Sequence, residues 1–311
     1  MGELEKVAVL VPTYRRTVML EELLGRLFAQ ETWRRYRVVV VDNDDQPTAR
    51  AVCERYSQLV TYVHQPQPGL VSARNTALRQ LLPDEDAFLF VDDDETVPHD
   101  WIERMCGFAE ARHADVVTGP VLPRFSASAP TWAVAGGFWE RRRLESGTQV
   151  DHVATNNTLV RAKSWRNFGE PLFNMAYNFS GGEDVEFFER FAAAGGVCVW
   201  NDDVPVHETV PDSRTTVQWV FRRALRIGNM RALRMRSPTA IAVGGLVRLG
   251  VGTCLTAKDL AIYRRVRARG FQMAGHGLGM LAVLAKKRTM EYARVPNEKS
   301  GASQPASDGR Q

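Results

Sequence analysis

Three runs of apolar residues divide the first hundred positions, and each ends in a polar or acidic turn. The runs are 7–11, 38–41 and 87–91, and the turns are Pro-Thr-Tyr-Arg-Arg at 12–16, Asp-Asn-Asp-Asp at 42–45 and Asp-Asp-Asp at 92–94. Between the first two runs, leucines recur at helical spacings of three and four. Strand, polar turn, helix, strand and acidic turn predict the α/β class, with a doubly wound, mostly parallel sheet.

The acidic triplet Asp92, Asp93 and Asp94 is the sharpest chemical signal. Ligands of open α/β sheets bind beyond the carboxyl ends of strands, which is where these residues fall. Adjacent carboxylates repel one another unless they are solvated or neutralised by a hard cation such as Mg²⁺ or Mn²⁺. Taken alone, the triplet fits either a cation site or an ordinary acidic turn.

The pattern continues with further elements. A helix is expected over 101–111, a strand over 115–119 and another over 153–160. Residues 124–150 show weak periodicity and predict a long loop beside the site, where acceptor specificity would reside, or a surface excursion anchored by aromatic residues.

The segment Gly181-Gly182-Glu183-Asp184 opens an amphipathic helical pattern. Both acids fall in its first turn, where the helix dipole favours negative charge, so helix capping alone explains one of them. His207 follows a short extended segment. Its imidazole is either a metal ligand or a structural side chain.

Five motifs in fixed order carry a resemblance. They are Val-Pro-Thr-Tyr-Arg at 11–15, Val-Asp-Asn at 41–43, Gly-Leu-Val-Ser-Ala-Arg-Asn at 69–75, the triplet at 92–94 and Gly-Gly-Glu-Asp at 181–184. Over about two thirds of the chain, the sequence resembles a family 2 glycosyltransferase with the GT-A fold. The layout of its last third is similar, more loosely, to bacterial exopolysaccharide glycosyltransferases of the succinoglycan type.

The resemblance implies roles for named residues. Asp184, beside Glu183, would be the general base that deprotonates the acceptor hydroxyl in an inverting, single-displacement transfer. Asp94, with Asp92 and His207, would hold Mg²⁺ or Mn²⁺ against the donor diphosphate. The expected nucleotide-sugar contacts are Pro12, Thr13, Tyr14, Arg15, Asp42, Asp44, Gly69, Arg74, Asn75, Asp92 and Asp93.

The net charge of +4 is distributed unevenly along the chain. Residues 214–294 hold 17 Lys and Arg against two acids, while the remainder holds 23 bases against 34 acids. Such a change usually accompanies a change of partner. The expected domains are therefore 1–213, a nucleotide-sugar-binding and catalytic domain; 214–295, a basic helical module; and 296–311, a disordered tail.

Two apolar segments, 241–257 and 271–284, lie among Arg and Lys in this module. The first is too short and polar for the roughly 20 apolar residues of a spanning helix. The pattern suits an anionic membrane surface, which would bring a lipid-linked saccharide acceptor to the site. The alternative is a helical appendage packed on the catalytic domain or a second subunit. Four scattered cysteines and a charged start without a secretory signal favour a cytoplasmic, membrane-peripheral protein.

Other function classes fit less well. Nucleic-acid binding would use the basic segment, but aromatic residues are sparse there and no known module occurs, so no nucleic-acid partner is expected. A nicotinamide-dependent dehydrogenase needs a GxGxxG loop where this chain has Pro-Thr-Tyr-Arg-Arg. A catalytically silent GT-A scaffold remains an alternative. A uridine diphosphate sugar is the expected donor, with thymidine and guanosine diphosphate sugars left open, and the sugar, acceptor and linkage are undetermined.

Overall fold

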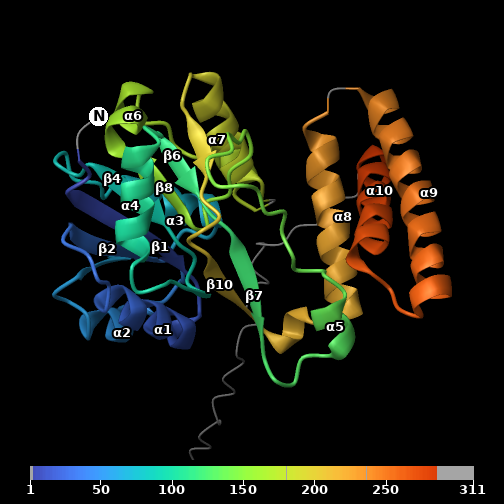
Figure 1. Ribbon diagram of the computed structural model, residues 1–311, viewed down its shortest axis with the longest axis horizontal. Coiled ribbons are helices and arrows are strands. Elements are labelled where there is room, and N and C mark those ends of the chain that lie inside the picture. The colour runs from blue at the N-terminus through green and yellow to red at the C-terminus, as the bar shows by residue number, and fades with distance from the viewer. Residues whose placement is uncertain (1–2, 180, 236, 286–311) are drawn as a thin grey trace, which may run out of the picture.

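The computed structural model describes residues 3–179, 181–235 and 237–285. The expected disordered tail lies outside these residues. The centre of the fold is a seven-stranded sheet in the order β3-β2-β1-β4-β8-β6-β9 (Figure 1). Its strands are β1 (Lys6–Thr13), β2 (Arg35–Asp42), β3 (Val60–His64), β4 (Ala87–Phe90), β6 (Val116–Thr118), β8 (Thr158–Arg161) and β9 (Cys198–Trp200).

The sheet is parallel except at one strand, because β8 runs antiparallel to both β4 and β6. The apolar runs predicted as strands become β1, β2 and β4, and their side chains are buried. The expected strand over 153–160 begins later, at Thr158, since the polar residues before it form a turn. The predicted α/β class and mostly parallel sheet are therefore confirmed.

Helices cover both faces of the sheet and enclose two apolar cores. One core joins the sheet to α1 (Thr17–Phe28), α2 (Arg50–Glu54) and α4 (Trp101–Ala111). The other joins it to α3 (Leu70–Leu78), α6 (Ala162–Asn167) and α7 (Glu183–Ala193). This two-sided burial explains why the strands are continuously apolar rather than alternating.

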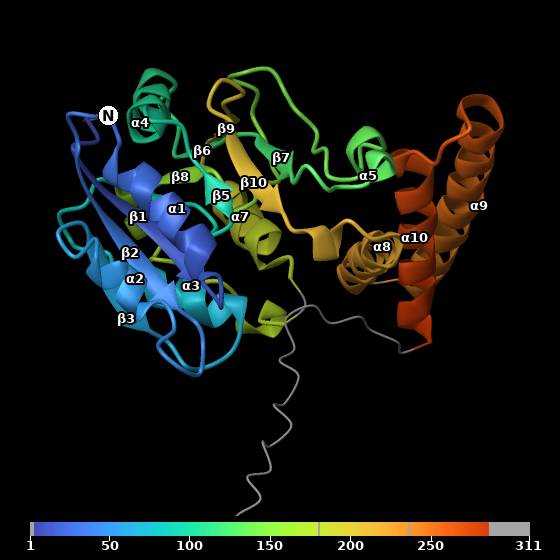
Figure 2. The same ribbon diagram turned by 90° about the horizontal axis from the view of Figure 1, so that it is seen from below.

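A three-stranded sheet, in the order β5-β10-β7, lies beyond the carboxyl ends of the main strands (Figure 2). It is made of β5 (Glu95–Thr96), β7 (Val121–Phe125) and β10 (Val206–Val210). The sequence pattern predicted a loop over 124–150, and the structure corrects this with the end of β7 and the short helix α5 (Thr131–Ala135).

Aromatic residues of that segment anchor the C-terminal helices. Phe138 meets Phe271 edge to face, and Trp139 stacks on Trp219 with ring centroids 6.1 Å apart. Burying such large rings against one another fixes the helices to the rest of the molecule. The alternative of an excursion held by aromatic anchors thus describes this segment.

Three helices, α8 (Val217–Leu233), α9 (Pro238–Tyr263) and α10 (Ala268–Leu284), stand beside the α/β part with α10 between the other two (Figures 1 and 2). Glycines allow their close approach. A Cβ at Gly228 would lie 2.2 Å from His276 O, and one at Gly277 would lie 2.5 Å from Leu249 N. Larger residues at these two positions would force the helix backbones apart.

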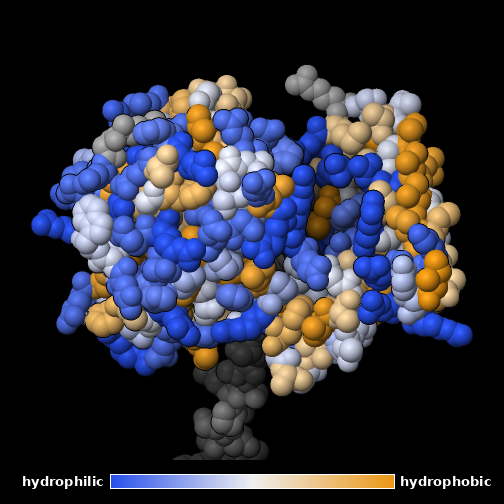
Figure 3. Space-filling model, in the orientation of Figure 1, coloured by the Kyte–Doolittle hydropathy of each residue, from blue (hydrophilic) through white to orange (hydrophobic). Residues whose placement is uncertain are grey.

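Helix α9 is longer than the apolar run 241–257, because it begins at Pro238 and continues through Lys258 and Asp259 to Tyr263. Among the described residues it is the one helix whose length and composition would allow it to cross a membrane. Only 17% of its most apolar stretch is buried. Val243, Leu246, Val247 and Val251 are exposed along its outer edge, which Figure 3 shows as a hydrophobic column.

His276 should give the helices a pH-dependent stability. Burial, and then Arg231 of α8 and Arg248 of α9, lower its pKa to about 4. Between pH 6.5 and 4 the unfolded chain therefore binds a proton that the folded chain does not, so the unfolding free energy should fall as the pH falls, by about 2–3 kcal/mol. Urea denaturation at pH 4.5 and pH 7 measures this loss. In His276→Gln the difference between the two pH values should shrink, and an unchanged difference would contradict the assignment.

Candidate active site

The three turns predicted to lie at one edge of the sheet do meet there. Strand β1 lies between β2 and β4, so the turn after Thr13 is flanked by the acidic turns at 42–45 and 92–94. Thr13 Oγ1 donates to Asp93 Oδ2 at 2.8 Å, which ties the first turn to the triplet. Parallel strand order alone produces this convergence.

Two arginines neutralise the buried members of the triplet. Arg16 Nη1 lies 2.7 Å from Asp93 Oδ1 and 2.8 Å from Asp94 Oδ2. Arg214 Nη1 lies 3.5 Å from Asp94 Oδ2 and 3.4 Å from Glu208 Oε1. Asp93 and Asp94 have side chains only 4% and 7% exposed, so each needs such a partner.

Burial still dominates the electrostatics of the triplet. It raises the pKa of Asp94 to about 7, against the opposing effect of Arg16. It also raises the pKa of Asp93 and, well above its ordinary range, that of Glu95. Neighbouring carboxylates raise the pKa of Asp94 further, and an added cation would favour its ionised form.

Arg74 joins the triplet to the start of α7. Its Nη2 lies 3.4 Å from Asp92 Oδ1, and its Nη1 forms a short ion pair with Glu183. The guanidinium and Glu183 are almost fully buried, whereas the Asp92 side chain is 33% exposed. Through this one side chain, carboxylates more than ninety residues apart in sequence are joined in one ion-pair network.

Asp184 occupies the first turn of α7, directly after Glu183. It is half-buried, and its Oδ1 accepts the N–H of Val185 at 2.8 Å. No donor among the residues that the structure describes is recorded at Oδ2. The helix starts here because Gly181 and Gly182 take positive φ angles of 77° and 87°, and such angles favour glycine.

The model of the family described as glycosyl transferase family 2 matches residues 8–168, which is more than half of the chain. The succinoglycan biosynthesis protein ExoM of Rhizobium meliloti (strain 1021) is 33% identical over 296 residues, covering 91% of this chain and 94% of ExoM. The chain belongs to glycosyltransferase family 2. Glycosyltransferase AglE of Haloferax volcanii is 27% identical over 204 residues, or 64% of this chain and 65% of AglE.

Solved structures confirm the GT-A fold of this family 2 member. Mannosyltransferase PcManGT from Pyrobaculum calidifontis, solved with GDP-Man and Mn²⁺, matches with a TM-score of 0.60 at 20% identity, over 89% of this chain and 86% of that chain. TarS 1–349 from S. aureus matches with a TM-score of 0.53 at 18% identity, over 91% and 92%. The predicted family and fold are thus confirmed, and the chain is a glycosyltransferase.

Several expected donor contacts belong instead to the scaffold of this family 2 enzyme. Pro12 is buried within β1, opposite Val41. Asp42 is fully buried, and its carboxylate accepts from Ala49 N, Asp44 N and the Tyr62 hydroxyl, so it orders its own turn. Its expected exposure to the nucleotide is therefore corrected.

Gly69 and Asn75 also fix the backbone of the loops around α3. Gly69 has φ 123°, and a Cβ there would collide with the Asn178 side chain. Asn75 is buried and exchanges two hydrogen bonds with the backbone of Phe173, at 2.9 and 2.8 Å. Both residues hold the neighbouring loops onto α3, and their contact with the donor stays a prediction.

Tyr14 and Arg15 remain exposed, whereas Asp44 is buried beside Arg15. The Tyr14 residue is 39% exposed, and the Arg15 guanidinium lies 5.1 Å from its ring centroid. Arg15 Nε donates to both carboxylate oxygens of Asp44. A pocket lined by Arg15, Thr17, Asp44, Asp45, Gln46 and Thr48 opens beside them.

His207 is not brought to the carboxylates. In the antiparallel register, Glu208 stands opposite Glu95 and His207 stands opposite Thr96. Side chains alternate along a strand, so Glu208 points to the triplet and the exposed His207 to the other face. The predicted histidine ligand is thus corrected by a one-residue difference of register.

Four residues of the site were not singled out from sequence. Arg16 and Arg214 contact Asp94, Glu208 shares Arg214, and Glu95 Oε2 accepts the Asp92 N–H at 2.9 Å. Arg16 directly follows the motif at 11–15, but the motif itself pointed to Arg15. The positive φ of Arg15, 53°, turns that residue away from the triplet. The other signals are single charged residues with no motif around them.

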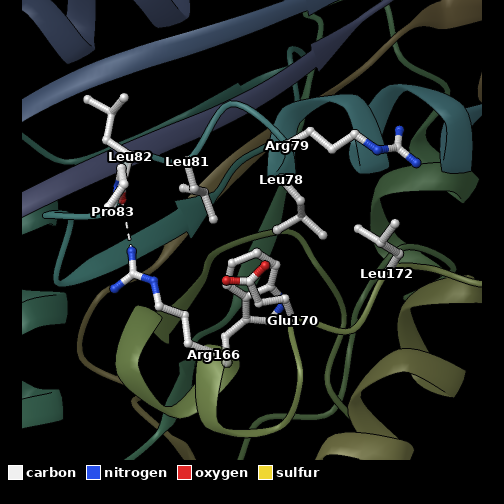
Figure 4. Close-up of a pocket in the computed structure, with 9 residues that line it drawn as sticks. Leu78, Arg79, Leu81, Leu82, Pro83, Arg166, Glu170 and Leu172 are labelled. Atoms are coloured by element: carbon white, nitrogen blue, oxygen red, sulfur yellow. Dashed lines mark hydrogen bonds between the residues drawn. The ribbon is translucent and has the colours of Figure 1, made fainter.

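A second hollow lies away from these carboxylates. Its lining comes from the end of α3, the following loop and α6, and includes Leu78, Leu82 and Arg166 (Figure 4). Arg166 Nη2 donates to Leu82 O at 2.8 Å across it. Its lining contains none of the acids described above.

Glu95 offers a test of the buried electrostatics. Burial raises the pKa of Glu95 well above its ordinary range and so disfavours the ionised carboxylate, and Glu95→Gln should therefore change the unfolding free energy by less than about 1 kcal/mol. Glu95→Ala removes the acceptor of the Asp92 N–H and should cost about 1–3 kcal/mol. Urea denaturation at pH 7 compares the two. A Gln variant as unstable as the Ala variant would show that the carboxyl is ionised.

Proposed function

We propose that this chain is an inverting glycosyltransferase that moves a sugar from a nucleoside diphosphate donor to a hydroxyl group of a saccharide or lipid-linked saccharide. The observation that carries the proposal is the Arg74 bridge from Asp92 to Glu183. It supports a shared site, because the base candidate Asp184 directly follows Glu183 and the bridge reaches the acidic triplet. A base and a diphosphate-binding group must face the same anomeric carbon for a single displacement.

The donor would lie along the edge of the sheet. The exposed Tyr14 ring offers a stacking surface for the base, and the adjacent pocket offers Asp44 and Thr48 to polar groups. Arg16 and Arg214 are within reach of the triplet and supply positive charge to the diphosphate. A uridine diphosphate sugar is our first candidate, consistent with TarS structures that contain UDP-GlcNAc, while PcManGT binds GDP-Man.

A divalent cation, Mg²⁺ or Mn²⁺, fits these residues when the donor contributes ligands. Within the described part of the chain no three His, Cys, Asp or Glu side chains form a metal shell by themselves. Mg²⁺ commonly uses one or two carboxylates together with substrate phosphates, and Asp94 with Asp92 supplies that number. When bound, the cation would neutralise charge on the departing diphosphate.

The remaining chemistry belongs to Asp184. Its Oδ2 accepts the proton of the acceptor hydroxyl while that oxygen attacks the anomeric carbon and the bond to the diphosphate oxygen breaks. The attack comes from the face opposite the leaving group, so the configuration inverts. Glu183, held by Arg74, positions Asp184 rather than sharing the proton transfer.

A donor screen tests the proposal. Uridine, thymidine and guanosine diphosphate sugars are added with Mn²⁺, with Mg²⁺ or with chelator, and thermal unfolding and donor hydrolysis are measured. We expect one nucleotide class to raise the melting temperature only when a cation is present, with slow hydrolysis. No stabilisation by any donor would contradict the proposal, and cation-dependent binding without hydrolysis or transfer to any acceptor would favour the silent scaffold.

We infer from helix α9 that the acceptor lies at a membrane. The outer face of α9 is exposed and uncharged from Val243 to Ala257, and arginines 264, 265, 267 and 269 follow at its end. Apolar faces bordered by arginine bind anionic bilayer surfaces, and this supports a peripheral position at the cytoplasmic face of the membrane. After lysis without detergent, ultracentrifugation should bring the protein down with the membranes, and full recovery in the supernatant would contradict this location.

A further inference from the structure

The three C-terminal helices bring together two arginines, which no carboxylate among the described residues balances, and a histidine whose pKa is lowered to about 4. Arg231 comes from α8, Arg248 from α9 and His276 from α10. The close contacts of the helices set this arrangement. His276 O lies against Gly228, one turn before Arg231, and Gly277 lies against Leu249, next to Arg248.

The arginine pair lacks an acidic partner within the described structure. The only acid among the described residues from 215 to 285 is Asp259, eleven positions beyond Arg248, or about 16 Å along the helix. From the α/β part, Glu189 approaches α8, but its carboxylate pairs with Arg234 and His152. Arg248 makes one long contact, 3.5 Å from Nη1 to Gly244 O.

His276 adds a second, independent observation. Its Nε2 is enclosed and has no hydrogen-bond partner among the described residues. An enclosed polar nitrogen without a partner costs stability unless a ligand or a small rearrangement satisfies it. The two arginines also lower the pKa of this ring, which shows that the potential around it is positive.

We propose that Arg231, Arg248 and His276 form a binding site for the phosphate group of an anionic membrane lipid. Three phosphate oxygens match the donors that two guanidinium groups present, and the ligand's charge offsets the unbalanced cations. The uncharged outer face of α9 adjoins the site, and it would accept the acyl region of the same lipid layer. Figure 3 shows a hydrophilic strip between α8 and this hydrophobic column.

The inference deepens the membrane part of the proposed function and rests on it. The proposed function requires only a general attraction between basic residues and anionic bilayers. The inference adds one specific phosphate site. A bound headgroup phosphate would orient α8, whose Met230 lies against Gly182 at the start of α7. The open cleft at Asp184 would then face a lipid-linked acceptor.

Vesicle binding separates the site from general electrostatics. The full chain is sedimented with phosphatidylcholine vesicles that contain or lack phosphatidylglycerol. Arg231→Gln with Arg248→Gln is compared with the control Arg265→Gln with Arg269→Gln, which removes the same charge from exposed positions in the loop after α9 and at the start of α10. We expect the first pair to lower binding to anionic vesicles at least tenfold more than the control pair. Equal losses in both pairs would overturn the site and leave membrane association intact.

Competition with soluble glycerol 3-phosphate distinguishes a lipid headgroup from a soluble phosphate as the ligand of the site. We expect it to compete with vesicles only at millimolar concentration, since it lacks the acyl chains that α9 would meet. Strong stabilisation by glycerol 3-phosphate with no binding of wild type to any vesicle would overturn the lipid source. Donor-dependent thermal stabilisation, measured on every variant, shows that the sheet-edge cleft is folded and keeps failure of this site distinct from failure of the glycosyltransferase.

Discussion

Asp184→Asn should lower the rate of sugar transfer by about 10³-fold, because a positioned general base typically contributes 10²–10⁴-fold. The amide is nearly isosteric and keeps an oxygen for the Val185 N–H. It cannot take up the acceptor proton. The dissociation constant of the donor should stay within about threefold of the wild-type value, since the role proposed for Asp184 is toward the acceptor rather than the nucleotide.

Glu186→Gln is the matched control for this prediction. Glu186 lies in the same first turn of α7 but pairs with Arg190 at the surface, at 2.8 Å. Its variant should keep near-normal turnover. Steady-state transfer assays and calorimetric donor titrations on both variants give the comparison. Near-normal transfer by purified Asp184→Asn would exclude Asp184 as the base.

Asp94→Ala should weaken cation-dependent donor binding by about 100-fold or more, because even residues behind metal ligands contribute 10–100-fold to affinity. The fold should tolerate the change. Arg16 keeps its contact with Asp93, and Arg214 keeps Glu208, so neither guanidinium is left without a carboxylate. Removing the Asp94 carboxyl also removes a group whose ionisation burial disfavours.

Asp84→Ala is the control for Asp94→Ala. Asp84 precedes the opposite end of β4, where it pairs with Lys6 and is 60% exposed. Donor titrations with Mn²⁺ and with chelator should show normal, cation-dependent binding in this variant. If Asp94→Ala binds the donor as tightly as wild type in Mn²⁺, the triplet does not hold the cation.

Local sequence predicted those parts of the site that depend on strand order. Unbroken apolar runs showed where the strands end, and parallel order then brought the turns at 12–16, 42–45 and 92–94 together. The helix beginning at Glu183 was also readable, since two glycines precede its acids. These signals are local because hydrophobic runs and helix starts are encoded within a few residues.

Side-chain direction was less predictable. Arg15 and Arg16 are neighbours with the same chemistry, yet only Arg16 reaches Asp93 and Asp94, because positive φ at Arg15 turns that residue toward Asp44. Likewise Glu208, and not His207, points toward the triplet, since one step along a strand reverses the face.

By itself, the sequence determined the fold class, the family and the edge of the sheet where the chemistry lies, because periodicity and ordered motifs are properties of consecutive residues. Only the tertiary structure decided which charges pair. The residues that come together are separated by 17 to 120 positions in the sequence. They are Arg74 and Glu183, Arg214 and Asp94, and Arg231 and Arg248. Such pairs depend on the crossing of strands and the close packing of helices at glycines, and no local pattern encodes those distances.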